Sequence, residues 1–321
     1  MYIRRLMLAL VACAACTLTF AQSWPSKPIR LVVPFPPGGG TDIIARQVVQ
    51  KVAESTNWSF IVDNKPGSGG NIGIDIVAKS PADGYTFVLG QASNLAINPS
   101  LYSKLPYDPV RDLTPISMLA SSPLAVVVSA DSPFKSLADV VSAAKAKPGT
   151  INFATSGNGT VSHLAMELFQ KSAGIQLVHI PYKGATQGVT DVIGGQVQIY
   201  VSGVPTLIGH IRSGKMRALA VTSVKRVDDL PQTPTIAESG YKGFEAVTWF
   251  GILGPAKLPR EMVARLNAEI NKALRNPDLQ KKLSDQGAVV AGSTPEGFAR
   301  FIRDEMSKWG KVVKDSGAKI D

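Results

Sequence analysis

The chain has very few of the residues on which most enzymes and metal proteins depend. Its 321 residues include two cysteines, Cys13 and Cys16, and three histidines, His163, His179 and His210. The histidine spacing matches no metal motif such as H-E-x-x-H, and no G-x-S-x-G turn marks a nucleophilic serine. We therefore expect no metal site, no cofactor and no catalytic constellation, and a function other than that of an enzyme.

The N-terminus has the pattern of a secretory signal peptide in residues 1–21. Arg4 and Arg5 precede an apolar run over residues 6–20, and a polar stretch begins after Ala21. The run is shorter than the roughly twenty residues that span a membrane, which argues against an anchor. Residues 10–13 resemble a lipobox, which leaves a lipoprotein as the alternative. Cleavage after Ala21 removes both cysteines, so the exported chain would contain no disulfide.

The composition indicates a large packed core and a mild preference for anions. Hydrophobic residues make up 45% of the chain and charged residues 18%, which favours globular domains over disorder, and the length suffices for two. The formal net charge is +10. The basic residues are scattered and no basic run carries interleaved aromatics, which argues against nucleic acid as a partner. The positive electrostatic field of a basic protein suits a small anionic ligand better.

Strand-like and helical segments alternate along the chain. Apolar runs typical of strands occur at residues 29–33, 60–62, 86–89, 125–128, 151–153, 177–180, 197–201 and 217–221. Helical patterns lie near residues 41–55, 72–79, 137–145, 161–172, 186–193, 205–213, 260–275 and 295–314. Repeated strand–helix units predict an α/β fold of mostly parallel sheets flanked by helices, which bind ligands at the carboxyl ends of their strands.

Two glycine-rich turns join a strand to a helix. The first follows the run LVV as PFPPGGGTD, residues 34–42, and the second is ATSGNGTVS, residues 154–162. The first turn of a helix has unpaired N–H groups and a partial positive charge, and glycine lets an anion approach them closely. The alternative is a tight turn with Thr41 or Asp42 as helix cap. Neither turn has the G-K-[ST] ending of a nucleotide phosphate loop. A third turn, GSGG at residues 67–70, is more typical of a simple helix entry.

The order of the segments predicts two lobes joined by two crossing segments. Residues 113–128 and 246–253 are the candidate crossings. We expect a first lobe made of residues 22–121 and 247–321, and a second lobe made of residues 122–246. Two crossings form a hinge, so the cleft between the lobes can close on a ligand.

Seven stretches of the mature chain form a characteristic ordered set. They are WPSKPIRLVVPFPPGGGTDIIAR, VDNKPGSGGNIGIDIVAKSPADGYT, LAINPSLYSKLPYDP, TSGNGTVSHLAMELF, HIPYKGA, GGQVQ and WFGILGPAKLP. In this order the chain resembles the Bug-type substrate-binding proteins of tripartite tricarboxylate transporter systems, over essentially its whole mature length. The resemblance implies a two-lobed periplasmic binding protein of the Venus-flytrap type that captures a small carboxylate and delivers it to a membrane permease.

The resemblance also implies a set of ligand-binding positions on both sides of the cleft. On the first lobe they are Phe35, Gly39, Gly40, Thr41, Asp42, Ser93 and Asn94. On the second lobe they are Ser156, Gly157, Asn158, Gly159, Thr160, His163, Tyr182, Lys183 and Gly184. For several of these the residues alone leave a structural role open: capping for Asp42, a buried hydrogen bond for His163, simple exposure for Lys183, and core packing for Phe35 and Tyr182.

One position departs from the pattern of the resembling proteins. Gln198 stands in GGQVQ where many of them carry an acidic residue. If Gln198 reaches the ligand, a partner for a ligand ammonium is lost, which favours a carboxylate without an amino group; apolar cleft walls would equally suit an aromatic acid. We expect a monomer whose partner is a permease or a sensor kinase.

Overall fold

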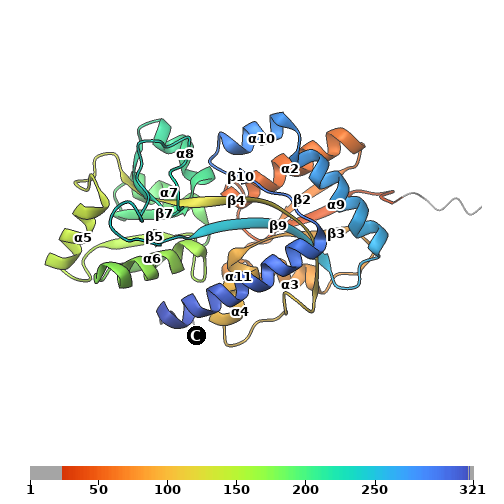
Figure 1. Ribbon diagram of the computed structural model, residues 1–321, viewed down its shortest axis with the longest axis horizontal. Helices are drawn as coiled ribbons and strands as arrows, with labels where there is room; N and C mark the ends of the chain where they lie inside the picture. The colour runs from red at the N-terminus through yellow and green to blue at the C-terminus, as the bar shows by residue number, and fades with distance from the viewer. Residues whose placement is uncertain (1–23, 317, 319–321) are drawn as a thin grey trace, which may run out of the picture.

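The computed structural model describes residues 24–316 and residue 318. The predicted signal peptide therefore lies outside the described residues. Within them, strands and helices alternate and form two lobes that lie side by side along the long axis of the molecule (Figure 1). None of the helices in this part of the chain combines the length and the apolar character that crossing a membrane requires.

The first lobe is built on three parallel strands in the order β2-β1-β3. Along β1, Leu31 and Val33 point into one apolar core and Val32 points into another, because successive side chains of a strand face opposite sides of the sheet. Both faces are therefore covered by helices. The strands are β1 (Ile29–Val33), β2 (Phe60–Asn64) and β3 (Thr86–Gln91); one face carries α2 (Gly40–Thr56), α9 (Arg260–Leu274) and α10 (Pro277–Ser284), and the other carries α3 (Asn71–Ala78), α4 (Asn98–Leu101) and α11 (Pro295–Ser316).

The second lobe repeats this design with the parallel strand order β7-β5-β6. Its helices cover both faces of the sheet, so β5 and β7 are mostly buried, whereas the edge strand β6 is partly exposed. The strands are β5 (Asn152–Thr155), β6 (Val178–Pro181) and β7 (Ile199–Gly203); one face carries α5 (Leu137–Ala146) and α6 (Val161–Ala173), and the other carries α7 (Ala185–Ile193) and α8 (Val204–Arg212).

Two long strands connect the lobes where the sequence predicts crossing segments. They are β4 (Leu113–Ser129) and β9 (Val247–Pro255), which pair antiparallel with each other. β9 also pairs with β3, and β4 pairs with β7 and with β8 (Met216–Val221), all antiparallel. The sheets are thus less parallel than expected, because the chain enters and leaves the second lobe along adjacent strands that must run in opposite directions. Of the predicted boundaries, 121/122 falls inside β4 and 246/247 at the start of β9, and both stay a prediction.

Helix α11 ties the crossing strands to both lobes. Figure 1 shows it running beneath β9 toward α6. The indole N–H groups of Trp249, on β9, and Trp309 both donate to the buried Glu305 carboxylate, at 2.8 and 2.9 Å. Satisfied in this way, Glu305 can remain inside an otherwise apolar cluster. The apolar core on this face is consequently continuous across the two lobes.

Candidate functional site

A cavity lies between the lobes, at the carboxyl ends of their parallel strands. Residues of the crossing strands, Leu124 on β4 and Thr248 and Phe250 on β9, contribute to its wall. We call it the inner cavity. Its other lining residues are Phe35, Pro36, Gly39, Gly40, Thr41, Gln91 and Ser93 from the first lobe, and Ser156, Thr160, Val161, Ser162, Ala185, Ser202, Gly203 and Thr206 from the second.

Four helices begin at the inner cavity. Its lining includes the first residue or the N-cap of α2, α6, α7 and α8, represented by Gly40, Val161, Ala185 and Gly203. Each helix start contributes a partial positive charge and N–H groups that lack partners within the helix. No charged side chain is among the residues that line this cavity. The field of the backbone therefore favours an anion, and no acidic side chain opposes it.

The first glycine turn is held in shape by a carboxylate that faces away from the cavity. Asp42 Oδ2 accepts a hydrogen bond from Gly38 N at 3.0 Å, and the same carboxylate pairs with Arg46 at 2.9 Å and accepts from Asn64 Nδ2 at 3.0 Å. Burial raises the pKa of Asp42, but the hydrogen bonds from Arg46, Gly38 and Asn64 outweigh it, so that the pKa lies below its usual value. Asp42 therefore stays ionised, and Arg46 of the same lobe balances its charge. Its hydrogen bond from Gly38 N gives it a structural role in the turn, which the sequence had left open.

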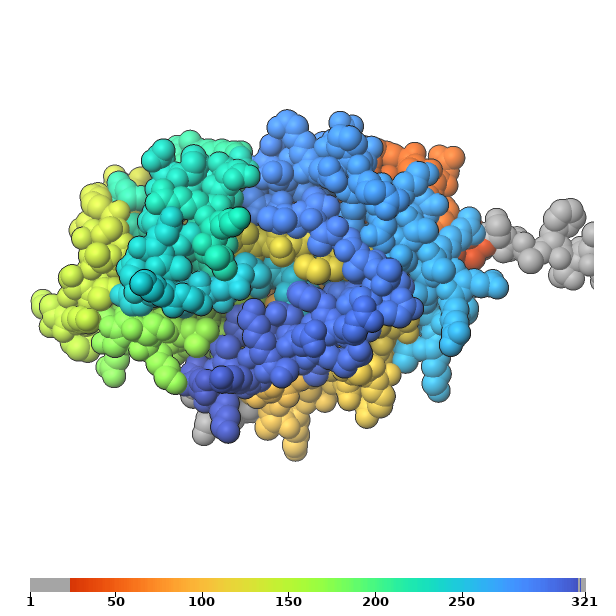
Figure 2. Space-filling view, in the orientation of Figure 1, coloured from red at the N-terminus to blue at the C-terminus, as the bar shows by residue number. Residues whose placement is uncertain are grey.

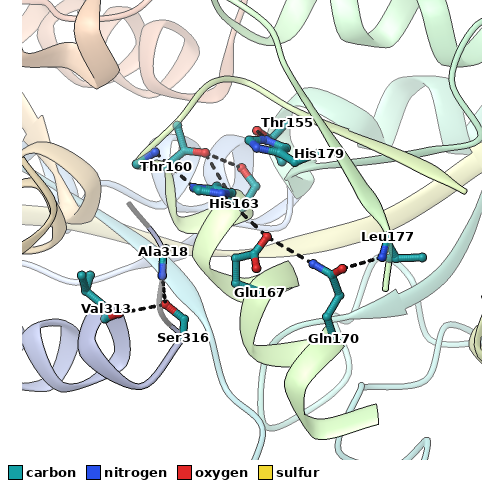
Figure 3. Close-up of polar contacts among 12 residues, drawn as sticks. Thr155, Thr160, His163, Glu167, Gln170, Leu177, His179, Val313, Ser316 and Ala318 are labelled. Carbon is teal, nitrogen blue, oxygen red and sulfur yellow. Dashed lines mark hydrogen bonds and ion pairs between the residues drawn. The ribbon is translucent and has the colours of Figure 1, made fainter. Parts of the chain in front are cut away.

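The second glycine turn is held by uncharged side chains (Figure 3). The Thr160 hydroxyl caps α6 by accepting from His163 N at 3.3 Å, and it donates to Gly157 O at 2.8 Å. His163 Nδ1 accepts the Gly159 N–H at 3.4 Å. Thr155, at the end of β5, lies with its Oγ1 2.7 Å from His179 Nε2. The turn that carries Ser156 and Thr160 to the cavity is therefore fixed from below by two imidazoles.

These two imidazoles are stacked and buried. The His163 and His179 rings lie 4.2 Å apart, and His179 also stacks on Phe153. Burial lowers the pKa of His163 to about 4. Burial and the charge of His163 lower the pKa of His179 to about 3. Both rings are neutral at physiological pH, which is the state that His163 needs in order to accept the Gly159 N–H.

Hydrogen bonds between the lobes complete both turns. Gly40 N, at the first position of α2, donates to Thr206 Oγ1 of the second lobe at 2.9 Å. Val161 N, at the first position of α6, donates to Ser93 Oγ of the first lobe at 3.3 Å. Each of these helices thus receives a hydroxyl cap from the opposite lobe. Because both bonds require the lobes to be in contact, they belong to a closed arrangement of the cleft.

A second, larger cavity opens beside the inner one. The two share Phe35, Pro36 and Ser156 as lining residues. We call it the outer cavity. Its remaining lining is the glycine-rich segment Pro66, Gly67, Ser68, Gly69 and Gly70 with Ile72 and Tyr102 on one side, and Gly157, Asn158, Pro181, Tyr182, Lys183 and Gly184 on the other.

The structure distributes the predicted site residues over four locations. Seven line the inner cavity: Phe35, Gly39, Gly40, Thr41, Ser93, Ser156 and Thr160. Five line only the outer cavity: Gly157, Asn158, Tyr182, Lys183 and Gly184. Four lie behind the walls, where they support the turns: Asp42, Asn94, Gly159 and His163. The seventeenth, Gln198, is remote from both cavities.

Gln198 lies at the wrong end of its strand to reach a ligand. It precedes β7, and its Oε1 accepts a hydrogen bond from Asn152 N at the start of β5, at 2.9 Å. Both positions are at the amino ends of parallel strands, whereas the cavities lie at the carboxyl ends. Gln198 therefore lines neither cavity, and the preference for a carboxylate without an amino group stays a prediction.

Several cavity residues escape sequence reasoning. Gly203 and Thr206 belong to the turn between β7 and α8, in which Pro205 stands in the first turn of the helix. A search for glycine at a strand-to-helix junction, which finds the two glycine turns, would also find this one. Gln91 and Ser202 end strands and could be found in the same way. Thr248 and Phe250 lie inside a crossing strand, and no local pattern distinguishes them from core residues.

The two lobes, their double crossing and the cavity at the strand ends define the class of two-lobed periplasmic binding proteins. The solved structure of the periplasmic binding protein BugD superimposes with a TM-score of 0.88 and 33% identity, over 92% of this chain and 99% of the other. A structure of Rpa4515 from R. palustris, solved with adipate, gives a TM-score of 0.90 and 36% identity, over 92% and 100%.

The sequence comparisons specify the family. The model of the tripartite tricarboxylate transporter family receptor matches residues 44–318. The chain is 42% identical over 315 residues to a UPF0065 protein encoded in the tcbD-tcbE intergenic region of Pseudomonas sp. (strain P51), covering 97% of this chain and 94% of the relative. It is 40% identical over 301 residues to BugT of Bordetella pertussis, covering 94% and 92%. The chain belongs to the tripartite tricarboxylate transporter receptor family, and it is a substrate-binding protein, not an enzyme.

Proposed function

We propose that this receptor captures a small carboxylate in the inner cavity and delivers it to a tripartite tricarboxylate-type permease. The observation that carries the proposal is the convergence of four helix starts on a cavity without a charged lining residue. A carboxylate that enters exchanges its water for N–H and hydroxyl donors, and charge-assisted hydrogen bonds of this kind are stronger than those between neutral groups. The adipate bound to Rpa4515 is an acid of the same class.

In this proposal the carboxylate is held by the residues of both glycine turns that line the inner cavity. Gly39 and Thr41 offer donors from the first lobe and Ser156 from the second. Gly40 and Thr160 shape the cavity wall, because their donors are already bonded to Thr206 Oγ1 and Gly157 O. A ligand that contacts both lobes binds the closed form more tightly than the open form, and it shifts the population toward closure. The hinge is proposed to lie at residues 121/122, inside β4, and at residues 246/247, where β9 begins.

The proposal extends to the context of the receptor. We infer export through a signal peptide cleaved after Ala21, and a monomer whose closed outer surface is read by the permease. A sensor kinase would read the same surface, so deletion of the neighbouring permease genes separates the two partners. Uptake of the ligand stops in that deletion if the permease is the partner, and continues if the receptor serves only a sensor.

A thermal-shift screen tests the proposed ligand class. Mono-, di- and tricarboxylates, amino acids and neutral sugars are each added to the purified mature protein. A ligand at 100 times its Kd should stabilise the protein by about 2.7 kcal/mol. We expect carboxylates alone to raise the melting temperature. A neutral sugar that does so, with no carboxylate having any effect, would show that the helix starts do not select an anion.

A further inference from the structure

A separate hollow lies between the lobes, on the side of the crossing strands opposite the inner cavity. Figure 2 shows it near the centre of the molecule, with residues of β4 at its floor. We call it the hinge-side hollow. Its lining residues are Ser121, Pro123, Val247, Ser284, Gly287, Ala288 and Val289 from the crossing strands and the first lobe, and Ser223, Lys225, Arg226, Val227, Asp228 and Asp229 from the second lobe.

The alternation of side chains along the crossing strands separates this hollow from the inner cavity. On β9, Val247 lines the hollow, whereas Thr248 lines the inner cavity. On β4, Pro123 pairs with Val247 and lines the hollow, whereas Leu124 lines the inner cavity. Because successive side chains of a strand face opposite sides, the two spaces lie back to back across the crossing strands. A bend of these strands that widens one space narrows the other.

The width of the hinge-side hollow depends on the angle between the lobes. The lobes are in contact at one edge of it, where a Cβ added to Gly287 would lie 2.4 Å from Val204 Cγ1 and 3.3 Å from Val227 Cγ1. Two residues further along the chain the walls separate, and the Val289 residue is 64% exposed. The hollow, of about 280 Å³, is therefore a wedge that begins where the contact between the lobes ends.

Both walls of this wedge carry an exposed valine. Val289, on β10 (Val289–Val290), pairs with Ser121 at the proposed hinge. On the opposite wall Val224, next to the lining residue Lys225, is 60% exposed. These two valines have the highest exposed fractions among the exposed large hydrophobic residues of the described part of the chain. Closing a water-filled gap between apolar surfaces is favourable, because it removes both surfaces from water.

The charged side chains of the hollow are compatible with a narrower gap. All four charged lining residues, two basic and two acidic, belong to the second lobe. Arg226 pairs with Glu238 at 2.9 Å, and Asp229 pairs with Arg212, so both are balanced within that lobe. The facing first-lobe wall contributes no charged residue to the lining. An approach of the two walls therefore brings no like charges together.

We propose that the hinge-side hollow sets the balance between the open and the closed form of the receptor. Opening of the cleft narrows the hollow and buries Val289 and Val224, so the two valines stabilise the open form when no ligand is bound. The apparent affinity for a ligand falls with the fraction of binding-competent protein, so these valines determine affinity without touching the ligand. The inference rests on the proposed function, in which the lobes close on a bound acid.

Two substitutions of similar shape at Val289 test the inference by calorimetry. Leucine adds apolar surface, whereas asparagine has the same branched outline and a polar end whose burial is unfavourable. The probe is adipate, or the acid of the thermal-shift screen that binds more tightly. We expect Val289→Leu to bind it about threefold more weakly than wild type, and Val289→Asn about threefold more tightly. Val224→Asn, on the opposite wall, should act in the same direction as Val289→Asn.

Val178→Leu and Val178→Asn provide the matched control. Val178 is also an exposed valine on a strand, β6, but it lines neither the hinge-side hollow nor the inner and outer cavities. Both variants should bind the acid as wild type does. Equal affinities of Val289→Leu and Val289→Asn, or the reverse order, would overturn the inference and leave the proposed function intact.

Small-angle X-ray scattering of the free proteins separates this inference from the proposed function. If no acid binds to any of the proteins, the proposed function fails, and the scattering alone decides on the hollow. A smaller radius of gyration for Val289→Asn than for Val289→Leu would then support the inference, because the asparagine variant would be the more closed. Equal radii would overturn it.

Discussion

The two glycine turns perform the same task with different chemistry. Each brings a helix start to the inner cavity and receives a hydroxyl cap from the opposite lobe. Within its own lobe, however, the first turn is shaped by the ionised Asp42 with Arg46, and the second by Thr160 and the neutral His163. The hydrogen bonds of Asp42 hold the first turn until acid protonates Asp42 itself. The hydrogen bond that His163 accepts in the second turn is lost once that imidazole gains a proton. The two halves of one site should therefore respond differently to pH.

The comparison also shows why an acidic residue is tolerated beside an anion site. Asp42 is buried and its pKa is lowered, so it carries a full negative charge close to the first turn. The charge is directed at Gly38 N and balanced by Arg46 and Asn64, on the side of the turn away from the cavity. The carboxylate thereby aligns the loop without lining the ligand cavity.

Gly40→Val should reduce ligand affinity more than any other change proposed here, because it prevents the first turn from contacting the second lobe. A Cβ at Gly40 would lie 3.4 Å from Thr206 Oγ1 and 3.6 Å from Pro205 Cβ, and the additional methyl groups of valine would extend into these atoms. We expect ligand affinity to fall at least a hundredfold, roughly 3 kcal/mol, by calorimetry. The stability of the free protein should change little.

Gly209→Val is the control for this prediction. Gly209 lies on the same α8 as Thr206, but a Cβ there meets no atom within 4 Å. Its affinity should equal that of wild type. Unreduced affinity in Gly40→Val would mean that the first turn does not approach the second lobe in the bound state.

Acid should weaken the second turn through His163. Its pKa falls from 6.5 in the unfolded chain to about 4 in the fold, so the unfolded state binds more protons between these values and stability decreases as the pH falls from 6.5 to 4. The full difference corresponds to about 3 kcal/mol, and we expect roughly 2 after relaxation of the acid form. Urea unfolding at pH 7, 5.5 and 4.5 should show a shallower decline in His163→Gln than in wild type.

Two neighbours influence the interpretation of this pH profile. His179, whose pKa burial lowers to about 3, adds a decline of the same sign in both proteins. Glu167 acts in the opposite sense, since burial raises its pKa and the fold gains stability when it is protonated. The informative quantity is therefore the difference between the variant and wild type. Parallel profiles would exclude His163 as the acid-sensitive support.

Removal of either reciprocal cap should reduce ligand affinity less than the changes above, and Thr206→Val shows how much closure depends on the first of these caps. Valine keeps the shape but removes the acceptor of the Gly40 N–H, which is 2.9 Å from Thr206 Oγ1. The loss of one hydrogen bond predicts about 1 kcal/mol, or roughly fivefold weaker binding. Thr206→Ser should bind like wild type. Ser93→Ala should lose less, because its bond to Val161 N is longer, at 3.3 Å. A larger loss in Ser93→Ala would reverse this ranking.

Local patterns predicted the parallel core of each lobe and the residues of both turns that line the inner cavity, such as Gly40, Thr41 and Ser156. These features depend on neighbours in the chain: an apolar run ends, glycines follow and a helix begins. The sequence left the choice open where a residue's role depends on the direction of its side chain or on a distant partner. Asp42 and His163 belong to the predicted segments, yet their side chains support the turns instead of lining the cavity.

The amino-acid sequence alone was sufficient for the fold class, the two crossing segments and the two turns, because strand, turn and helix propensities act over a few residues. Only the tertiary structure placed Thr206 against Gly40, Ser93 against Val161, and Thr248 and Phe250 in the cavity wall. It also showed that Gln198 lies at the opposite end of the sheet. These relations join residues far apart in the chain, and they arise from how the two lobes pack together, which short-range patterns do not encode.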